Sequence, residues 1–177
     1  MGDLLVVSGP PGAGKSAIAA AVADRWNPSV LIEGDAFFGF LRRGAIQPWL
    51  PEANAQNAVV SAATGAAAGR FAAGPAMVVY DGVVGPWFLP TFLGHAGLVS
   101  CSYVVVLPPL EQCLHQVRTR VGHSFTDEGA ARHMHDQFAR TAIDPRHVFA
   151  NPAGAFDGTV EAIVAAHAAG TLTTLPI

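Results

Sequence analysis

Lysine is almost missing from this chain of 177 residues: Lys15 is the only one, and the other nine basic side chains are arginines. The formal net charge is −3 and the arginines are spread along the chain, so no basic stripe suited to a nucleic acid is present. Nucleic acid is therefore not an expected partner.

Long apolar runs are missing as well, although hydrophobic residues make up 51 % of the chain and its mean hydropathy is +0.36. No stretch reaches the roughly 18 apolar residues that a membrane-spanning helix needs. The richest window, residues 58–73, is interrupted by Ser61, Thr64, Gly65, Gly69 and Arg70. The chain also starts without the basic region of a signal peptide. We expect no membrane partner and a cytoplasmic location.

Cysteine is scarce, which excludes a disulfide framework. Cys101 and Cys113 lie in apolar surroundings and are expected to be buried thiols. The seven histidines show no metal-ligand spacing with cysteine; His133 and His135 are two residues apart and would face different sides of a helix. A histidine-based metal site is not expected.

Apolar runs bounded by turn residues alternate with helical stretches along the whole chain, the pattern typical of a parallel sheet with helices on both faces. No repeat, linker or composition break divides the sequence, so residues 1–177 are expected to form a single domain. The strands are predicted at 3–8, 29–33, 76–80, 102–107 and 147–150. Helices are predicted at 15–26, within 35–44, and at 52–73, 109–121, 127–140 and 159–168.

A glycine-rich segment follows the first predicted strand: Gly9-Pro10-Pro11-Gly12-Ala13-Gly14-Lys15-Ser16, and Ala17 continues into the first helix. It fits G-x-x-x-x-G-K-[ST], the phosphate-binding loop in which backbone N–H groups surround an anion at a helix N-terminus. In that motif the lysine reaches the β- and γ-phosphates and the hydroxyl of Ser16 binds Mg²⁺. The segment predicts ATP and Mg²⁺ binding and a three-layer αβα P-loop fold with a five-stranded parallel sheet.

Two acids follow predicted strands. Asp35 comes after the second strand and is predicted to orient or deprotonate an acceptor hydroxyl; the alternative is a helix N-cap. Asp81 ends the third strand and is predicted to hold Mg²⁺ together with Ser16; the alternative is a turn aspartate before Gly82.

Residues 118–146 contain five arginines and are predicted to form a helical lid over the nucleotide. Arg118 is a candidate nucleotide ligand, and Arg120 is the candidate that meets charge developing in the transition state. Thr126 is the expected N-cap of the second lid helix. The alternative is a static helical hairpin, and Arg140 is expected to pair with Asp136 or Asp144 on the surface.

The segment after Asp35 is rich in aromatic residues, and so is the segment after Asp81. Phe38, Arg42 and Trp87 are, with Asp35, the candidate acceptor-binding residues, because pockets are mostly apolar with a few polar groups. A pocket of this composition suits a bulky, partly apolar alcohol. The alternative is that these aromatic residues serve only for packing.

Two segments resemble the small P-loop kinases that include gluconate kinase and chloramphenicol phosphotransferase. One is Arg120-Val121-Gly122-His123-Ser124-Phe125 with the later Gln137-Phe138, and the other is Ile32-Glu33-Gly34-Asp35. The resemblance implies a doubly wound fold, use of ATP with Mg²⁺, and acceptor binding by Asp35. The chain departs from gluconate kinase in having Ala36-Phe37-Phe38 where a histidine is expected, and from adenylate kinases in lacking Pro-Arg after Asp81-Gly82.

The sequence therefore predicts an ATP-dependent phosphotransferase acting on a hydroxyl of a small molecule, an antibiotic or a sugar-like metabolite. Two alternatives stay open. One is a nucleotide-sugar kinase of the zeta-toxin type, which needs a basic acceptor groove where this chain offers Arg42 and Arg43. The other is a protein that sequesters a toxic compound in an ATP-dependent way without phosphorylating it.

Overall fold

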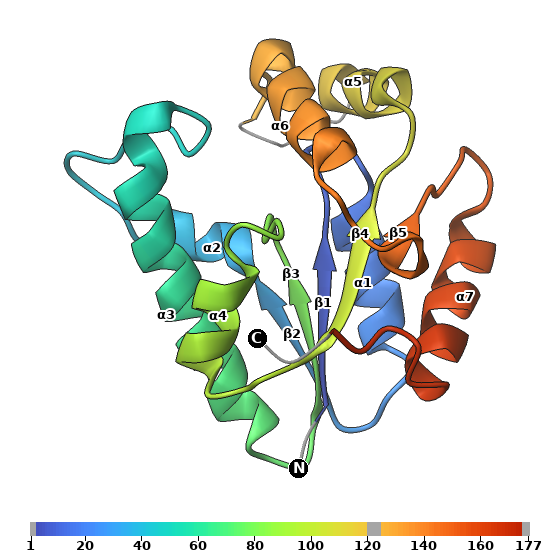
Figure 1. Ribbon diagram of the computed structural model, residues 1–177. Coiled ribbons are helices and arrows are strands. Elements are labelled where there is room, and N and C mark those ends of the chain that lie inside the picture. The colour runs from blue at the N-terminus through green and yellow to red at the C-terminus, as the bar shows by residue number, and fades with distance from the viewer. Residues whose placement is uncertain (1–2, 120–124, 175–177) are drawn as a thin grey trace.

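A computed structural model describes residues 3–119 and 125–174 of the chain. Its centre is a parallel sheet of five strands in the order β2-β3-β1-β4-β5 (Figure 1). Every residue of β1, β3 and β4 is buried, as expected for inner strands covered on both faces. The strands are β1 (Leu4–Ser8), β2 (Ser29–Glu33), β3 (Met77–Asp81), β4 (Ser102–Val106) and β5 (Val148–Phe149).

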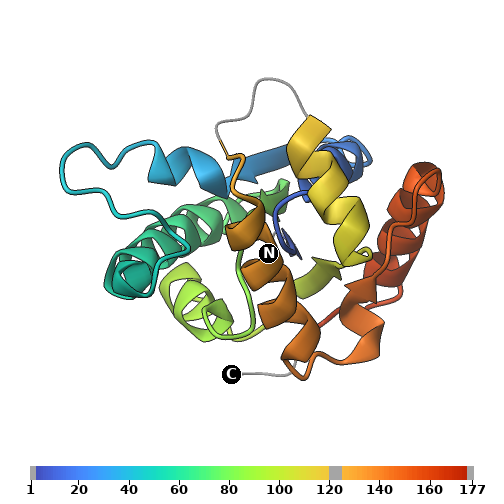
Figure 2. The same ribbon diagram turned by 90° about the horizontal axis from the view of Figure 1, so that it is seen from above.

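Helices cover both faces of the sheet and complete three layers (Figures 1 and 2). On one face α3 and α4 form a core with residues such as Ala68, Tyr80 and Phe92, and on the other α1 and α7 pack Ile18 and Ile163 against the strands. The predicted fold class is confirmed. The helices are α1 (Lys15–Ala23), α2 (Gly34–Phe38), α3 (Asn54–Ala72), α4 (Leu89–Ala96), α5 (Leu110–Thr119), α6 (Glu128–Arg140) and α7 (Phe156–Ala168).

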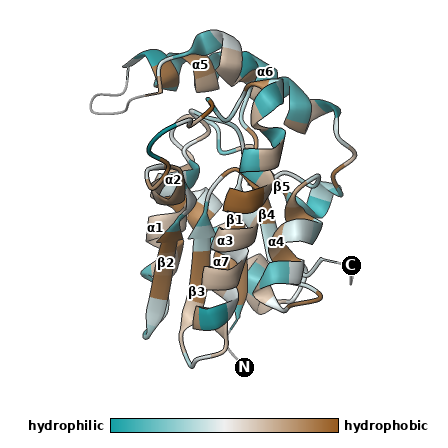
Figure 3. Ribbon diagram, turned by 90° about the vertical axis from the view of Figure 1, so that its left-hand side faces the viewer, coloured by the Kyte–Doolittle hydropathy of each residue, from teal (hydrophilic) through white to brown (hydrophobic). Residues whose placement is uncertain are grey.

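Helices α5 and α6 lie beyond the carboxyl ends of the strands, and much of their ribbon has the colour of hydrophilic residues (Figure 3). The N-cap of α6 is Asp127, whose carboxylate accepts a hydrogen bond from the backbone N–H of Ala130 at 2.9 Å. The prediction of Thr126 was one residue too early, because either side chain can cap and only the backbone geometry selects between them. Among the described helices, none combines the length and the apolar character required to cross a membrane.

Helix α4 was not predicted from the sequence, because its residues Pro90 and Gly94 are more typical of a loop than of a helix. Pro90 lies in the first turn, where a missing N–H removes no helical hydrogen bond. The helix packs closely on α3 at Gly65 and Gly69: a Cβ at Gly65 would meet the backbone carbonyl of Phe92, and one at Gly69 that of Ala96. Tertiary packing therefore supports a segment with weak local signals.

This close packing predicts opposite effects of the same substitution at two helical glycines. Gly65→Ala forces the backbones of α3 and α4 apart, and we expect it to lower the free energy of unfolding by about 1–3 kcal/mol. Gly94→Ala adds a methyl group where no atom lies within 4 Å, so it should be neutral or stabilising by up to about 1 kcal/mol. Chemical denaturation checks both variants, and equal effects would contradict the packing described here.

Candidate active site

The chemistry-bearing residues meet because parallel strands present their carboxyl ends at one edge of the sheet. β1 leads into the glycine-rich loop, and β3, beside it, ends at Asp81. Asp81 is in register with Val7 of β1 and with Glu33, the last residue of β2. The phosphate loop and both acidic strand ends thus lie side by side at this edge.

The glycine-rich segment forms a tight turn between β1 and α1. Gly12 and Gly14 adopt left-handed backbone conformations, with φ of 78° and 85°, and a Cβ at Gly12 would meet the backbone carbonyl of Cys113. Gly14 is the N-cap of α1 and supplies no side-chain cap, which leaves the first backbone N–H groups of the helix for an anion. Lys15 begins the helix and is only 8 % exposed.

Asp81 is the electrostatic centre of this edge. Burial raises the pKa of its carboxyl group, the Lys15 ammonium and a hydrogen bond with Ser16 act in the opposite direction, and the charges of Asp35 and Glu33 raise it further. All four side chains are therefore close enough to affect a single carboxylate.

The oxygens of Asp81 and Ser16 fit a magnesium ion. Asp81 Oδ1 is buried and lacks a hydrogen-bond partner within the described part of the chain. Across residues 3–119 and 125–174, no group of three or more His, Cys, Asp or Glu side chains is arranged to hold a metal. A site built from one carboxylate, one hydroxyl and phosphate oxygens is the kind that Mg²⁺ prefers, because this ion keeps several waters and is seldom held by protein groups alone.

Asp35 is an exposed residue in the first turn of α2. The N-cap of this helix is Glu33, with no side-chain hydrogen bond, so the alternative interpretation of Asp35 as a cap is wrong. The charge of Asp35 raises the pKa of both Asp81 and Tyr80, which places the carboxylate near the ends of β2 and β3.

Tyr80 is a site residue that the sequence analysis missed. Its hydroxyl lies where a Cβ on Gly34 or Gly82 would be, so both glycines make room for it. Burial raises the pKa of Tyr80 to about 12; a hydrogen bond with Thr64 acts in the opposite direction, and the charges of Asp35 and Asp81 raise it further. The available signal was one polar aromatic residue at the end of an aliphatic strand, followed by Asp-Gly.

The loop after β5 also reaches the phosphate loop. Asn151 has a positive φ of 41°, and its side-chain amide donates to the carbonyl oxygen of Ala13 at 3.5 Å. The side chain of Gln112 in α5 donates to the carbonyl oxygen of Asn151 at 2.9 Å. These contacts tie the glycine-rich turn to two elements distant in sequence.

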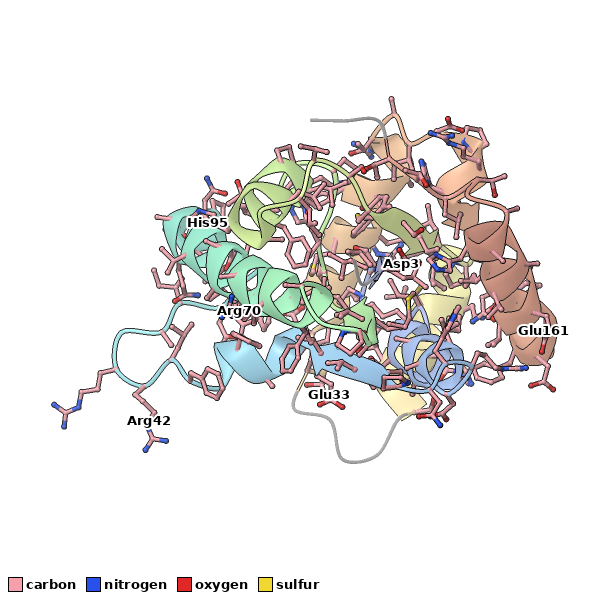
Figure 4. All side chains as sticks on the ribbon, turned by 90° about the horizontal axis from the view of Figure 1, so that it is seen from below. Asp3, Glu33, Arg42, Arg70, His95 and Glu161 are labelled. Carbon is pink, nitrogen blue, oxygen red and sulfur yellow. The ribbon has the colours of Figure 1, made fainter. Side chains whose placement is uncertain are left out.

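The predicted acceptor residues are only partly brought together. Phe38 lies one turn after Asp35 on the same face of α2, and it lines a hollow of about 190 Å³ with Leu41, Ala45, Ile46, Gln47 and Pro48. Trp87 is 41 % exposed and packs on Phe138 of α6, with ring centroids 5.2 Å apart. Arg42 points from the outer end of its loop into solvent (Figure 4).

The predicted lid is attached to the body of the protein through α6. Phe138 belongs to the main core, and His135 Nε2 lies 2.9 Å from the carbonyl oxygen of Pro108. Arg118 pairs with Glu128 at 3.7 Å, and Arg140 pairs with Asp136 at 3.7 Å, as expected for Arg140. Arg120 lies outside the described residues.

Comparison with known proteins identifies the family. Residues 4–142 match the model of a family described as an AAA domain, and the chain belongs to this family of P-loop proteins. A search of the curated proteins gives no match.

Solved structures share the fold over nearly the whole chain. A gluconokinase from Sinorhizobium meliloti is 22 % identical in sequence and superposes with a TM-score of 0.69. The match covers 97 % of this chain and 95 % of the gluconokinase chain. A sugar kinase from Janibacter is 18 % identical with a TM-score of 0.68, and the match covers 97 % of this chain and 94 % of the sugar kinase chain. A Deinococcus radiodurans tunicamycin resistance protein is 19 % identical with a TM-score of 0.65, covering 100 % of both chains. The predicted resemblance to small P-loop kinases is confirmed.

The raised pKa of Asp81 gives a prediction for Asp81→Asn. A carboxyl group whose pKa is raised by folding loses its proton later in the folded than in the unfolded protein, so its ionisation lowers stability as pH rises towards neutrality. We expect Asp81→Asn to equal or exceed the wild type in unfolding free energy at neutral pH, with a smaller difference in acid. MgATP should raise the melting temperature of the wild type much more than that of the variant.

Thermal unfolding at acidic and neutral pH, with and without MgATP, makes both measurements. A variant that is less stable at neutral pH and is stabilised fully by MgATP would contradict the assignment of Asp81.

Proposed function

We propose that this member of the AAA domain family transfers the γ-phosphate of ATP, with Mg²⁺, to a hydroxyl group of a small molecule. The observation that carries the proposal is the convergence of Lys15, Ser16 and Asp35 on the buried carboxylate of Asp81. One edge of the sheet thus combines a phosphate-binding loop, an oxygen site for a cation and a second acid that is exposed to an acceptor.

On the phosphate side, the N–H groups of the turn and the Lys15 ammonium bind the phosphates, and Ser16 and Asp81 would hold the ion. An ion held there would neutralise negative charge on the phosphates. Arg118, near the end of α5, is proposed to add positive charge, and the sequence alone proposes Arg120 for the same role. Because Lys15 is already buried, little side-chain freedom is lost when the phosphates bind.

On the acceptor side, Asp35 is proposed to position the hydroxyl and take its proton. The acceptor oxygen forms a bond to the γ-phosphorus, the bond from this phosphorus to the bridging oxygen breaks, and ADP leaves with the bonding electrons. The proton passes to the carboxylate of Asp35 and then to solvent. Asp35 suits this role because it is exposed, whereas Asp81 is buried and faces Lys15.

The structural neighbours support a small-molecule acceptor, since two of them are named as a gluconokinase and a sugar kinase. The direction of Arg42 into solvent disfavours a zeta-toxin-like kinase, which needs a basic acceptor groove. Sequestration without transfer is the remaining candidate, favoured by a neighbour named as a tunicamycin resistance protein. ADP formation that depends on an acceptor separates transfer from sequestration.

Lys15→Ala should remove turnover and strongly weaken ATP binding, because the only lysine carries the point charge that faces the phosphates. The fold should persist, because Lys15 is the first residue of α1 and alanine is a strong helix former. Circular dichroism and ATP titration calorimetry check this. Normal ATP turnover by a folded Lys15→Ala protein would remove the basis of the proposed function.

Asp35→Asn tests the acceptor side against a matched control, Glu33→Gln, which changes another exposed acid at the end of the same strand. We expect Asp35→Asn to lower kcat by about 10²-fold or more, because an oriented acid is lost, with ATP affinity nearly unchanged. Stability should change by less than about 0.5 kcal/mol, since Asp35 is exposed and caps no helix.

Glu33→Gln should keep kcat within a few-fold of the wild type. Steady-state assays of ADP formation with an acceptor provide the readout. Equal losses in the two variants would show that only the local negative charge matters, and normal turnover by Asp35→Asn would require another base.

A further inference from the structure

The loop that joins α2 to α3, residues 39–53, projects from the body of the protein (Figure 2), and the start of α3 fixes its shape. The side chain of Gln56 accepts a hydrogen bond from the backbone N–H of Ile46 at 2.9 Å and donates one to the carbonyl oxygen of the same residue at 2.8 Å. The side-chain amide of Asn57 donates to the carbonyl oxygen of Pro48 at 2.6 Å. Because Ile46 and Pro48 line the hollow of about 190 Å³, α3 holds one wall of that hollow.

Trp49, the residue after Pro48, brings this loop into contact with a distant part of the chain. Its ring meets that of Phe125 edge to face, with ring centroids 4.9 Å apart and ring planes at 87°. Both side chains are half-buried. Phe125 also packs against a buried cluster shared by α5 and α6, which consists of Leu114, Val117 and Ala131. The Trp49–Phe125 pair therefore joins the α2–α3 loop to helices α5 and α6.

Helix α5 lies directly against the phosphate loop. A Cβ at Gly12 would collide with the backbone carbonyl of Cys113, so the two backbones touch. The side chain of Gln112 donates to the carbonyl oxygen of Asn151 at 2.9 Å, and the amide of Asn151 donates to that of Ala13 at 3.5 Å. A ligand that steadies the glycine-rich turn therefore also steadies α5.

Packed contacts thus run from the phosphate loop through α5, Phe125 and Trp49 to the wall of the hollow. Energetic coupling between two sites is carried by physically connected elements of this kind. The α2–α3 loop is suited to respond, because Ala53 is its only buried residue and residues 42–47 are all exposed. A loop with so few buried contacts opens locally at low cost, and binding elsewhere can order it.

We propose that the Trp49–Phe125 pair couples the nucleotide site to the hollow on the acceptor side. A nucleotide on the phosphate loop steadies α5, α5 holds Phe125, and Phe125 holds Trp49, so the wall formed by Ile46 and Pro48 opens less often. By reciprocity, a molecule that fills the hollow binds more tightly to the nucleotide-loaded protein. The inference rests on the proposed function for the role of the hollow, but the coupling does not require phosphate transfer.

Hydrogen exchange of the full chain, followed by NMR with and without saturating MgADP, measures this coupling. The reporting amides are those of Ile46 and Leu50, which donate to the side chain of Gln56 and to the carbonyl oxygen of Gln47. In the wild type we expect MgADP to slow their exchange about three- to ten-fold. An effect that passes through one aromatic pair cannot exceed the free energy of that pair, which sets this range.

Trp49→Leu and Phe125→Leu each remove one ring of the pair. We expect the slowing by MgADP to disappear in both variants, and the double variant to behave like either single one, because the two changes break the same contact. If Trp49 served only the stability of the loop, exchange would be faster in both states and the ratio between them would stay that of the wild type. This ratio therefore separates a positioning role from a structural one.

Trp26→Leu is the matched control. Trp26 makes an edge-to-face contact of the same kind, with His167 at a centroid distance of 5.4 Å, but it lies between α1 and β2 at the opposite end of the sheet. This variant should keep the full effect of MgADP on the reporting amides. Titration calorimetry with MgADP establishes saturation for every variant.

Three results would overturn the inference: unchanged exchange of the reporting amides in the saturated wild type, an MgADP effect that persists in both Trp49→Leu and Phe125→Leu, or an equal loss in Trp26→Leu. Assays of ADP formation keep the two proposals apart. An MgADP effect that depends on Trp49, without phosphate transfer to any hydroxyl compound, would support this inference and contradict the proposed function. Acceptor-dependent ADP formation without an MgADP effect on the loop would do the reverse, and a lack of MgADP binding would contradict both.

Discussion

The buried carboxylate of Asp81 beside the buried ammonium of Lys15 is the interaction on which the site depends. Burial alone would drive this carboxyl group towards its neutral form, and Lys15 and Ser16 partly restore its charge. The sheet imposes this proximity, because β1 and β3 are neighbours and both end at the same edge. The edge is therefore arranged for the phosphates of a nucleotide before they bind, at a cost in stability that a ligand can offset.

Crowding at the strand ends links this edge to the acceptor side. The hydroxyl of Tyr80 occupies space that only glycine at positions 34 and 82 leaves open, and the same hydroxyl contacts Thr64 of α3. α3 is held in turn against α4 at Gly65 and Gly69. Packing between α3 and α4 therefore fixes the position of Thr64 relative to Tyr80 at the strand ends.

The parts of the site that could be predicted are those encoded by local sequence. The phosphate loop is one continuous motif, and Asp35 and Asp81 each follow a recognisable strand. Tyr80 escaped prediction because its surroundings depend on which helix packs over which strand. Helix α4, which packs on α3, was itself not predicted, because Pro90 and Gly94 are typical of loops. Arg42 was expected near the acceptor because of its charge, but the sequence does not specify the direction of a loop side chain, and this one points into solvent.

The fate of the γ-phosphate tests the central claim most directly. In a single-turnover experiment, the full chain is mixed with MgATP labelled at the γ-phosphate and with one member of a defined panel: gluconate, a phenicol, an aminoglycoside or a nucleoside. We expect that with at least one acceptor the label moves to a new phosphate ester, in an amount equal to the ADP formed. Label that remains in ATP while a compound stays bound, or that appears only as inorganic phosphate, would contradict it.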